Sequence, residues 1–417
     1  MPQTISERIL SSKAGREVHA GEIVVCTVDL VIGTDASAPM AIDYFEQMGG
    51  ARVFDPSRIV FALDHYAPPT GDATRALHDR VRVFARRHGV EVYEVGEGIS
   101  HQIVVERGRA LPGDLVVGAD SHTVTCGALN LFATGVGSSD LAAAMMTGQI
   151  WLRVPASIRV VLTGWRPRGL TAKDVALAIV GEIGAEGGNY QTIEFHGPAL
   201  PQFALEDRLV LSNLCVEMGA KAAIFPDDGA VDAYLTGRTA ARGAPVAADR
   251  GARYTREVSL TLGELSPRIA MPHAPDKVHA LDDAVGLPIQ MVFIGTCTGG
   301  RVADVHEAIA VIERRGGRVA PGVQLVVTPA SGEVRARLDA DGSLRRLAAM
   351  GAIVTTPGCG ACCGTSGVIP GDGMNVLSTA NRNFKARMGN ATASIYLASP
   401  AACAAAAVTG RITDPRS

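Results

Sequence analysis

The 417-residue sequence lacks the features that would assign it to a membrane or to a nucleic acid. No apolar run approaches the roughly 18 residues that a membrane-spanning helix needs. The first residues, MPQTISERILSSKAGREV, lack the apolar core of a secretory signal. A formal net charge of −3 gives no reason to expect a polyanionic partner. We therefore expect a cytoplasmic protein that binds neither nucleic acid nor membrane.

Cysteine is scarce, with 8 residues in the chain, yet three of them lie in the segment TPGCGACCG at 356–364. In the reducing cytoplasm, clustered cysteines bind metal or perform chemistry more often than they form disulfides. Cys26, Cys215 and Cys403 lie in apolar or alanine-rich segments and are interpreted as packing residues. Cys126 fits either role.

Short β-branched runs alternate with amphipathic stretches, which indicates an α/β fold whose parallel sheets are flanked by helices. At roughly 150 residues per domain, the length predicts two or three domains. Segments rich in proline and glycine near 164–169 and 265–287 are the best candidate boundaries. They divide the chain into α/β domains at 1–163, 164–270 and 271–417.

Periodicity and capping residues predict the individual elements. Thr171 and Asp174 fit a capping box at the start of a helix, and Gly89 fits a helix stop. Strands are expected in the runs RIVFAL, DLVVG, SIRVVLTG, PIQMVFIG, VQLVV and AIV. Helices are expected at 71–89, 137–152 (with a serine cap), 171–184, 302–317 and 332–350.

The unusual polar clusters of the sequence all follow predicted strands. They are LDH at 63–65, GADSHT at 118–123, IEFHG at 193–197, IGTCTGG at 294–300 and TPGCGACCG at 356–364. Ligands of open α/β sheets bind outside the carboxyl ends of the strands. We therefore expect these five ends to converge on one cleft.

Three cysteines near these strand ends form a candidate metal site. Cys359 and Cys362 make a Cys-x-x-Cys pair, and Cys297 lies in a similar loop rich in glycine and threonine. A redox dithiol would not require Cys297, and a structural zinc site needs a fourth ligand that the sequence does not offer. Three thiolates also fit a four-iron cluster that lacks its fourth protein ligand. Spacing alone leaves these alternatives open.

Carboxylates stand beside imidazoles in Asp64-His65 and in the DSH segment at 120–122, and His101 lies in GISHQIVVERG. A neighbouring carboxylate raises the pKa of an imidazole and fixes its tautomer, which suits a general acid. Each histidine could equally cap a loop. A mononuclear metal hydrolase is a further alternative, although the chain has no complete zincin motif.

Two arginines, Arg382 and Arg387, lie in the irregular segment STANRNFKARMG after a predicted strand. Guanidinium groups bind carboxylates through two parallel hydrogen bonds, so this pair favours a di- or tricarboxylate as ligand. Two solvated surface arginines are the alternative reading.

Together these segments resemble the aconitase superfamily, and within it the branch of large subunits that act on isopropylmalate and homoaconitate. The resemblance extends from TISERIL near the start to GRITDP near the end. It implies three α/β domains with mostly parallel sheets around a central [4Fe–4S] cluster, without the swivelling fourth domain. The segments that carry it, in order, are GADSHTVTCGALNLFATGVGSSDLAAAMMTGQIWLRVP, FIGTCTGGR, TPGCGACCG and NRNFKARMG with YLASP.

The resemblance implies that Cys297, Cys359 and Cys362 hold the cluster at three corners, which leaves one iron open as a Lewis acid. Cys363 is then a bystander. Proton donation is assigned to His65, supported by Asp64. Residues implied around the cluster-bound water, the cluster and the substrate carboxylates are His101, Asp120, Ser121, His122, Glu194, Asn381, Arg382 and Arg387.

The activity implied is that of a hydro-lyase that isomerises a 2-hydroxy di- or tricarboxylate by dehydration and rehydration. Conversion of 2-isopropylmalate to 3-isopropylmalate, in leucine biosynthesis, is the first expectation, with homoaconitate, citramalate and dimethylmalate as alternatives. The family's serine base lies on the swivelling domain, so we expect a separate small subunit in a heterodimer or heterotetramer. A cluster-free RNA-binding or scaffold protein is the alternative of another class.

Five residues depart from the family pattern beside the cluster loops. Thr296 and Gly300 stand where the family usually has Ser and Asn, and Ala386 stands where Gly is usual. The other two are Ser366 and Ala380. None of them is an expected ligand or acid–base residue, so they bear on substrate identity and not on the type of reaction.

Overall fold

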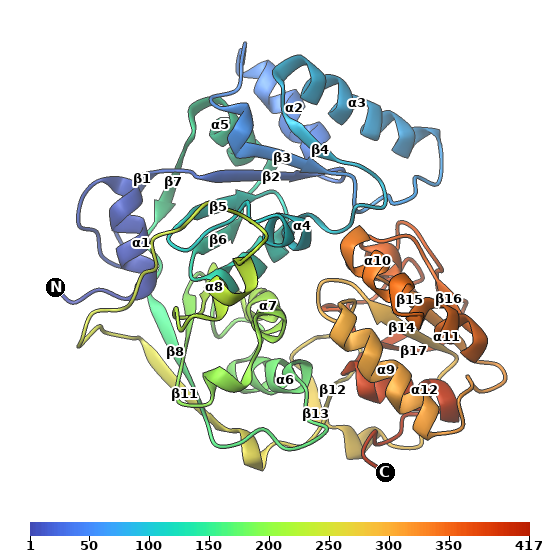
Figure 1. Cartoon of the computed structure of the whole chain (residues 1–417). Helices are drawn as coiled ribbons and strands as arrows, with labels where there is room; N and C mark the ends of the chain where they lie inside the picture. The colour runs from blue at the N-terminus through green and yellow to red at the C-terminus, as the bar shows by residue number, and fades with distance from the viewer.

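The computed structural model describes residues 1–417 and arranges them around four β-sheets (Figure 1). In Figure 1 the first large sheet runs from blue to teal in the upper part, the second from green to yellow below it, and the third from yellow through orange to red from the lower centre to the right. Only three strand pairs are antiparallel: β1 with β7, β12 with β13, and β12 with β18. The predicted α/β class with mostly parallel sheets is confirmed.

The first large sheet has five parallel strands in the order β4-β3-β2-β5-β6. Its inner strands are buried along their whole length, as expected for a parallel sheet covered on both faces. The strands are β2 (Leu30–Thr34), β3 (Ile59–Ala62), β4 (Glu91–Tyr93), β5 (Leu115–Gly118) and β6 (Phe132–Gly135). The helices of this region are α1 (Ile5–Ala14), α2 (Ala38–Gln47), α3 (Asp72–His88), α4 (Ser100–Glu106) and α5 (Ser138–Thr147). A two-stranded ribbon joins β1 (Ile23–Thr27) to β7 (Gln149–Arg153).

The second sheet has four parallel strands in the order β10-β9-β8-β11. The predicted capping box is confirmed, because Thr171 and Asp174 exchange side-chain and backbone hydrogen bonds at the start of α6. Leu205, Leu209 and Val231 from this region pack into one core with Leu30 of the first sheet, so the two regions share a hydrophobic interior. The elements are β8 (Ser157–Thr163), β9 (Thr192–His196), β10 (Ala222–Ile224), β11 (Arg256–Thr261), α6 (Ala172–Ile183), α7 (Leu205–Leu214) and α8 (Ala230–Leu235).

The third sheet has seven strands in the order β13-β12-β18-β17-β14-β15-β16. Its strands are β12 (Arg268–Ala270), β13 (Val278–Ala280), β14 (Met291–Gly295), β15 (Gln324–Thr328), β16 (Ala352–Val354), β17 (Asn375–Ser378) and β18 (Ser394–Leu397). Its helices are α9 (Val302–Arg314), α10 (Gly332–Ala340), α11 (Ser343–Met350) and α12 (Pro400–Thr409). The sheets therefore occupy residues 30–135, 157–261 and 268–397 in turn.

Two helix predictions need correction. The segment 137–152 is not one serine-capped helix: α5 begins after Gly137, makes no side-chain cap, and ends where Gly148 adopts a left-handed φ of 67°. Buried and exposed residues then alternate in β7, which is the period of a strand. The segment 332–350 is two helices, because Gly342 with a φ of 80° separates α10 from α11.

The loops that follow β3, β5, β14, β16 and β17 lie together where the three regions meet. Hydrogen bonds join them directly, for example from Cys359 N–H to the Asp64 carbonyl at 3.0 Å and from Arg382 to Ser121 at 3.0 Å. The fifth expected contributor, the segment IEFHG at 193–197, is not among them, because Glu194 within β9 contacts the N-terminal helix instead. No helix in this structure combines the length and the apolar character that crossing a membrane requires.

Candidate active site

The two cysteine-bearing loops meet through the side chain of Asn381. Its Nδ2 donates to Cys297 Sγ at 3.4 Å, and the Cys362 thiol donates to its Oδ1 at 3.6 Å. Cys297 follows β14, while Cys359 caps and Cys362 belongs to the short 3₁₀ helix η7 (Gly360–Cys363). Burial raises the pKa of the Cys297 thiol to about 12. Such a thiol stays neutral until a metal replaces its proton.

The adjacent cysteines 362 and 363 face different partners. Cys363 Sγ lies 2.8 Å from Thr365 Oγ1 and 3.8 Å from the His65 carbonyl oxygen. Cys362 Sγ instead accepts a hydrogen bond from the Arg387 guanidinium at 3.8 Å. The cationic donor would stabilise Cys362 as a thiolate ligand, whereas its hydrogen bond to Asn381 Oδ1 is one that the neutral thiol makes.

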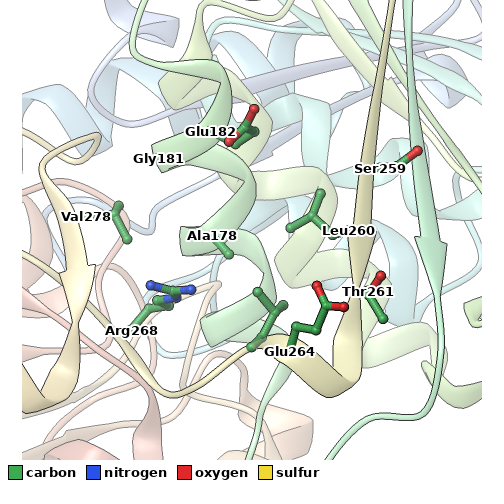
Figure 2. Close-up of a pocket in the computed structure, with 10 residues that line it drawn as sticks. Ala178, Gly181, Glu182, Ser259, Leu260, Thr261, Glu264, Arg268 and Val278 are labelled. Atoms are coloured by element: carbon green, nitrogen blue, oxygen red, sulfur yellow. The ribbon is translucent and has the colours of Figure 1, made fainter.

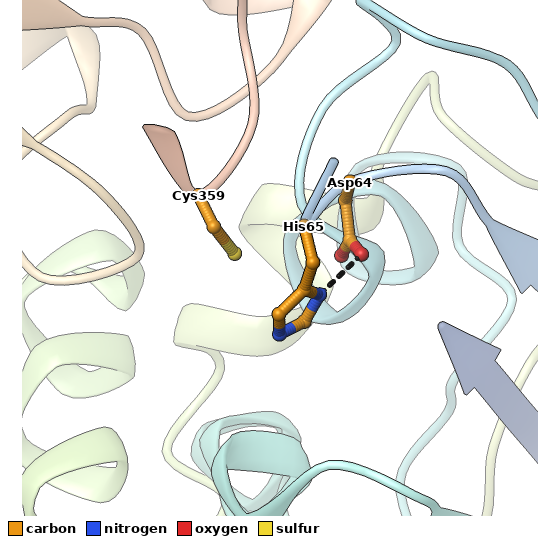
Figure 3. Close-up of side chains that lie close together, drawn as sticks. All are labelled: Asp64, His65 and Cys359. Atoms are coloured by element: carbon orange, nitrogen blue, oxygen red, sulfur yellow. Dashed lines mark hydrogen bonds and ion pairs between the residues drawn. The ribbon is translucent and has the colours of Figure 1, made fainter. Parts of the chain in front are cut away.

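His65 lies between carboxylates, beside Cys359 of the second cysteine loop (Figure 3). Its Nδ1 is 2.7 Å from Asp64 Oδ1, and its Nε2 is 3.4 Å from Asp120 Oδ2. Ligand atoms of Asp64, His65 and Cys359 all lie within 4.8 Å of one another. Burial alone would lower the pKa of His65, but the Asp64 and Asp120 carboxylates outweigh it and raise that pKa well above its ordinary value. His65 is therefore an imidazolium that can donate a proton.

Asp120 is held as a carboxylate. Burial opposes this charge, yet hydrogen bonds from His122 and His65 keep the pKa of Asp120 well below its usual range. The backbone N–H of His122 donates to Asp120 Oδ1 at 2.7 Å, at the start of the 3₁₀ helix η2 (Ser121–Leu129). His122 Nε2 lies 3.0 Å from Glu217 Oε1.

Arg382 crosses from the third sheet to the first. Its Nε donates to Glu217 Oε1 at 2.8 Å, and one terminal nitrogen donates to Ser121 Oγ at 3.0 Å. Arg387 leaves its buried Nε without a partner. The two guanidinium groups together supply donors for an anionic ligand at the mouth of the cysteine loops.

His101 is a buried imidazole whose two ring nitrogens have no hydrogen-bond partner. Burial lowers its pKa to about 3, so the ring is neutral. It lies 6.4 Å from the His122 ring, measured between centroids. Two unsatisfied nitrogens in a buried ring indicate a site that a polar ligand or water completes.

The structure does not bring Glu194 to this site. Its fully buried carboxylate accepts hydrogen bonds from the N–H groups of Ile5 and Ser6, at the start of α1, and from Ser157 Oγ and Tyr254 Oη, at 3.0–3.2 Å. We therefore correct the assignment of Glu194: it anchors the N-terminal helix, whose amino end favours a negative charge. The residues that do lie together are Asp64, His65, His101, Asp120, Ser121, His122, Cys297, Cys359, Cys362, Asn381, Arg382 and Arg387.

Of two cavities in the structure, one adjoins this site and the other lies apart from it. One of about 390 Å³ is lined by Asp120, Ser121 and Lys221, so it opens beside the acid–base residues. Another of about 400 Å³ lies between α6 and the segment after β11, with Glu182 and Arg268 among its lining residues (Figure 2). It shares no residue with the candidate site, so we assign the chemistry to the convergent loops.

Comparison with known proteins agrees with this geometry. The family model for the aconitase family (aconitate hydratase) matches residues 7–288 and 283–410. The chain is 43% identical over 417 residues to "3-isopropylmalate dehydratase large subunit 1" of Methanopyrus kandleri, covering 100% of this chain and 99% of that one. It is 42% identical over 420 residues to the protein of the same name from Thermotoga maritima, with the same coverage.

The chain belongs to the aconitase family. A solved structure, Thermococcus kodakaraensis aconitase X in its holo-form, matches the fold with a TM-score of 0.53 over 91% of this chain and 88% of that chain. At 13% identity this likeness concerns the fold alone. The resemblance noted in the sequence is thus confirmed at the level of family and fold.

In this aconitase-family chain, two residues of the candidate site were not predicted from the sequence. Glu217 holds both His122 and Arg382, and Asn213 Nδ2 donates to Cys297 Sγ at 3.1 Å. They stand four residues apart at the end of α7 and in the following 3₁₀ turn, which puts them on one face. The available signal was a polar residue followed four positions later by an acid, within the otherwise largely apolar segment LVLSNLCVEM.

Asp35 and His78 hold the loop that carries His65. The buried Asp35 carboxylate accepts the backbone N–H groups of His65 and Tyr66 at 2.9 Å each. His78 Nε2, on α3, lies 2.9 Å from the same carboxylate. The loop that carries the acid is therefore fixed by the core of the first sheet.

The structure explains Gly300 and places Ala386 and Thr296 in backbone conformations that favour glycine. A Cβ at Gly300 would lie 2.7 Å from the Thr328 carbonyl oxygen and 2.8 Å from that of Thr296, so this backbone excludes the usual Asn. Ala386 has a φ of 66°, a conformation that glycine adopts without strain. Thr296 also has a positive φ, of 71°, at the turn into the Cys297 loop. Nothing in the structure explains Ser366 or Ala380.

Substitution of Glu194 and of Glu217 tests the corrected assignment, in which Glu194 is structural and Glu217 belongs to the site. Glu194→Gln should lower the free energy of unfolding by about 1–3 kcal/mol, because α1 loses buried acceptors, and should leave turnover unchanged. Glu217→Gln should lower kcat/KM about 10- to 100-fold, because Arg382 and His122 lose an anionic partner. Chemical denaturation and steady-state kinetics on both variants decide the matter. The reverse pattern would restore Glu194 as the catalytic glutamate.

Proposed function

We propose that this chain is the large subunit of a [4Fe–4S] hydro-lyase that isomerises 2-isopropylmalate to 3-isopropylmalate by dehydration and rehydration. The names of relatives that match the full chain at 40–43% identity support the substrate. Homoaconitate, citramalate and dimethylmalate remain the alternatives, because they share the hydroxyl and the carboxylates that the site would recognise.

The cysteine set fits an iron–sulfur cluster by its chemistry. Cys297, Cys359 and Cys362 would hold it; two amides, Asn213 and Asn381, contact Cys297, and the Arg387 guanidinium contacts Cys362. Neutral and cationic donors of this kind suit an anionic thiolate cluster. When bound, the cluster supplies a Lewis-acidic iron for a hydroxyl and a carboxylate.

The acid–base residues would divide the proton transfers between them. His65 donates a proton to the departing hydroxyl, and Asp64 fixes its tautomer through Nδ1. Asp120 faces the other ring nitrogen and preserves the positive charge. Neutral His101 and the Glu217-bound His122 line the same space and can orient a water molecule.

One observation carries the proposal: His65 is kept protonated by two carboxylates while a ring nitrogen lies within 4.8 Å of the Cys359 thiol. A proton donor beside a metal-binding cysteine suits loss of hydroxide from a bound hydroxy acid. Ser121, Asn381, Arg382 and Arg387 then supply donors for the carboxylates of that acid.

The proposal includes a partner. The relatives are named as large subunits, so we propose that a small subunit completes the site and supplies the base that removes the carbon-bound proton. All eight cysteines are free, which fits the reducing conditions of a cytoplasmic enzyme.

A panel of substrates tests the proposed class. The anaerobically prepared chain, combined with a small subunit from the same source, should dehydrate 2-hydroxy diacids, as followed by the absorbance of the unsaturated product. Hydroxy monocarboxylates and neutral alcohols should be inert. Turnover of a neutral alcohol faster than of every diacid would exclude the proposed class.

Arg382→Lys should lower kcat/KM about 10- to 100-fold. An ammonium is a point charge and cannot contact Glu217, Ser121 and a carboxylate at the same time, and one charge-assisted hydrogen bond contributes about 1.5–3 kcal/mol. Arg346→Lys is the matched control, since Arg346 pairs with Glu313 on the surface and should lose nothing measurable. Equal kinetics of the two variants would remove Arg382 from the site.

A further inference from the structure

Lys173 is a buried cation in α6 that has no carboxylate partner. Its side chain is almost fully enclosed, with 2% of the residue exposed. Nζ donates to the carbonyl oxygens of Thr379 at 2.9 Å and Ala380 at 2.6 Å, and no salt bridge neutralises it. The adjacent Asp174 carboxylate accepts from Thr171 and from the Arg268 N–H instead. A buried charge without a counter-charge is costly, so an anion is expected nearby.

Two sets of acidic groups lie near this ammonium. One is the cysteines beside the end of β17; the other is the carboxylates of Glu206, Asp207, Asp304 and Glu307, which line a cavity of about 240 Å³ together with Lys173 but form no salt bridge with it. Ala380 precedes Asn381, whose side chain contacts both Cys297 and Cys362. Thr298 Oγ1, one residue after Cys297, donates to the same Thr379 carbonyl as Lys173, at 2.7 Å. Burial lowers the pKa of Lys173 to about 8, and the groups that act in the opposite direction are, in decreasing order, Cys297, Cys403, Cys362 and Asp304.

We propose that Lys173 is the counter-charge that the chain provides for its cysteine-bound cluster, and that it acts on cluster retention as a positioning residue. The inference rests on the proposed iron–sulfur function. When the cluster binds, the three cysteines become thiolates and bring negative charge into a buried space. Lys173 already supplies a positive charge in that space in the cluster-free protein. The positive charge of Lys173 therefore stabilises the cluster-bound form of the protein, and the bound cluster stabilises that charge.

Lys173→Met tests this coupling, because methionine has a similar length and no charge. The first readout is the rate at which the anaerobically prepared protein loses iron to a chelator. We expect that rate to rise about tenfold or more, the effect of one lost charge–charge interaction. The second readout is the gain in thermal midpoint on loading the cluster, which should be smaller in the variant than in the wild type.

Two further variants separate charge from structure. Lys173→Gln keeps an amide donor for the two carbonyls, and should lose iron as fast as Lys173→Met. Lys13→Met removes another partly buried lysine, which lies in α1 and pairs with Asp29 at 2.7 Å. Its iron retention should equal that of the wild type.

Each result decides between the inferences. Wild-type iron retention and midpoint gain in Lys173→Met would overturn the role of Lys173 and leave the cluster intact. Full retention in Lys173→Gln alone would assign the effect to the hydrogen bonds and also overturn it. A wild-type chain that never holds iron would overturn the proposed function and this inference with it.

Discussion

Serine in place of Cys297, Cys359 or Cys362 should abolish iron binding by this chain. Serine is isosteric, but its alcohol is a far weaker acid and a harder ligand than a thiol, so the cluster loses a corner. The expected result is loss of the brown absorbance, with iron and sulfide near zero in the anaerobically purified protein. Both readouts precede catalysis and need no partner subunit.

Cys363→Ser is the matched control, because Cys363 is adjacent to a proposed ligand in the chain but faces Thr365 and the His65 carbonyl. It should keep most of its iron. A Cys363→Ser variant that is colourless beside a Cys362→Ser variant that stays brown would reverse the ligand assignment.

Replacement of His65 by glutamine should lower kcat about 10²- to 10⁴-fold, the usual contribution of a general acid, while iron content stays at the wild-type value. Glutamine retains a donor of similar size but cannot deliver a proton. An unchanged kcat would assign the acid to another group, and loss of iron would show that His65 serves the metal site instead.

Asp64→Asn should move the pH dependence of the same step. The pKa of His65 is raised by the carboxylates of Asp64 and Asp120, so the acid stays protonated to a higher pH than an ordinary imidazole does. Removal of the Asp64 charge lowers that pKa, and the alkaline limb of the kcat profile should therefore move to lower pH. A profile that stays in place, or moves upward, would contradict the role of Asp64.

The sequence alone predicted those features of the fold that depend on residues close together in the chain. The Thr171–Asp174 box is a contact between neighbours, and the cysteine loops follow strands whose β-branched runs are unmistakable. The convergence of these loops followed from the rule for strand ends in parallel sheets. Such features need no knowledge of how the three sheets are oriented relative to one another.

The sequence alone did not predict hydrogen bonds in which the two side chains lie far apart in the chain. His122 and Glu217 are separated by 95 positions, and Glu217 follows a helix whose neighbours are core residues. Glu194 lies in β9, two residues before the end of the strand, but its sheet directs it toward Ser6, which is 188 positions away. Only the docking of the sheets distinguishes these two glutamates.

The most direct test of the central claim is the conversion of 2-isopropylmalate by the iron-loaded chain together with the proposed small subunit, followed by proton NMR. The account predicts that 2- and 3-isopropylmalate approach one equilibrium from either side, and that neither changes when Cys297→Ser replaces the wild type. With iron fully bound and both subunits present, failure to interconvert the two isomers while another hydroxy acid is turned over would contradict it.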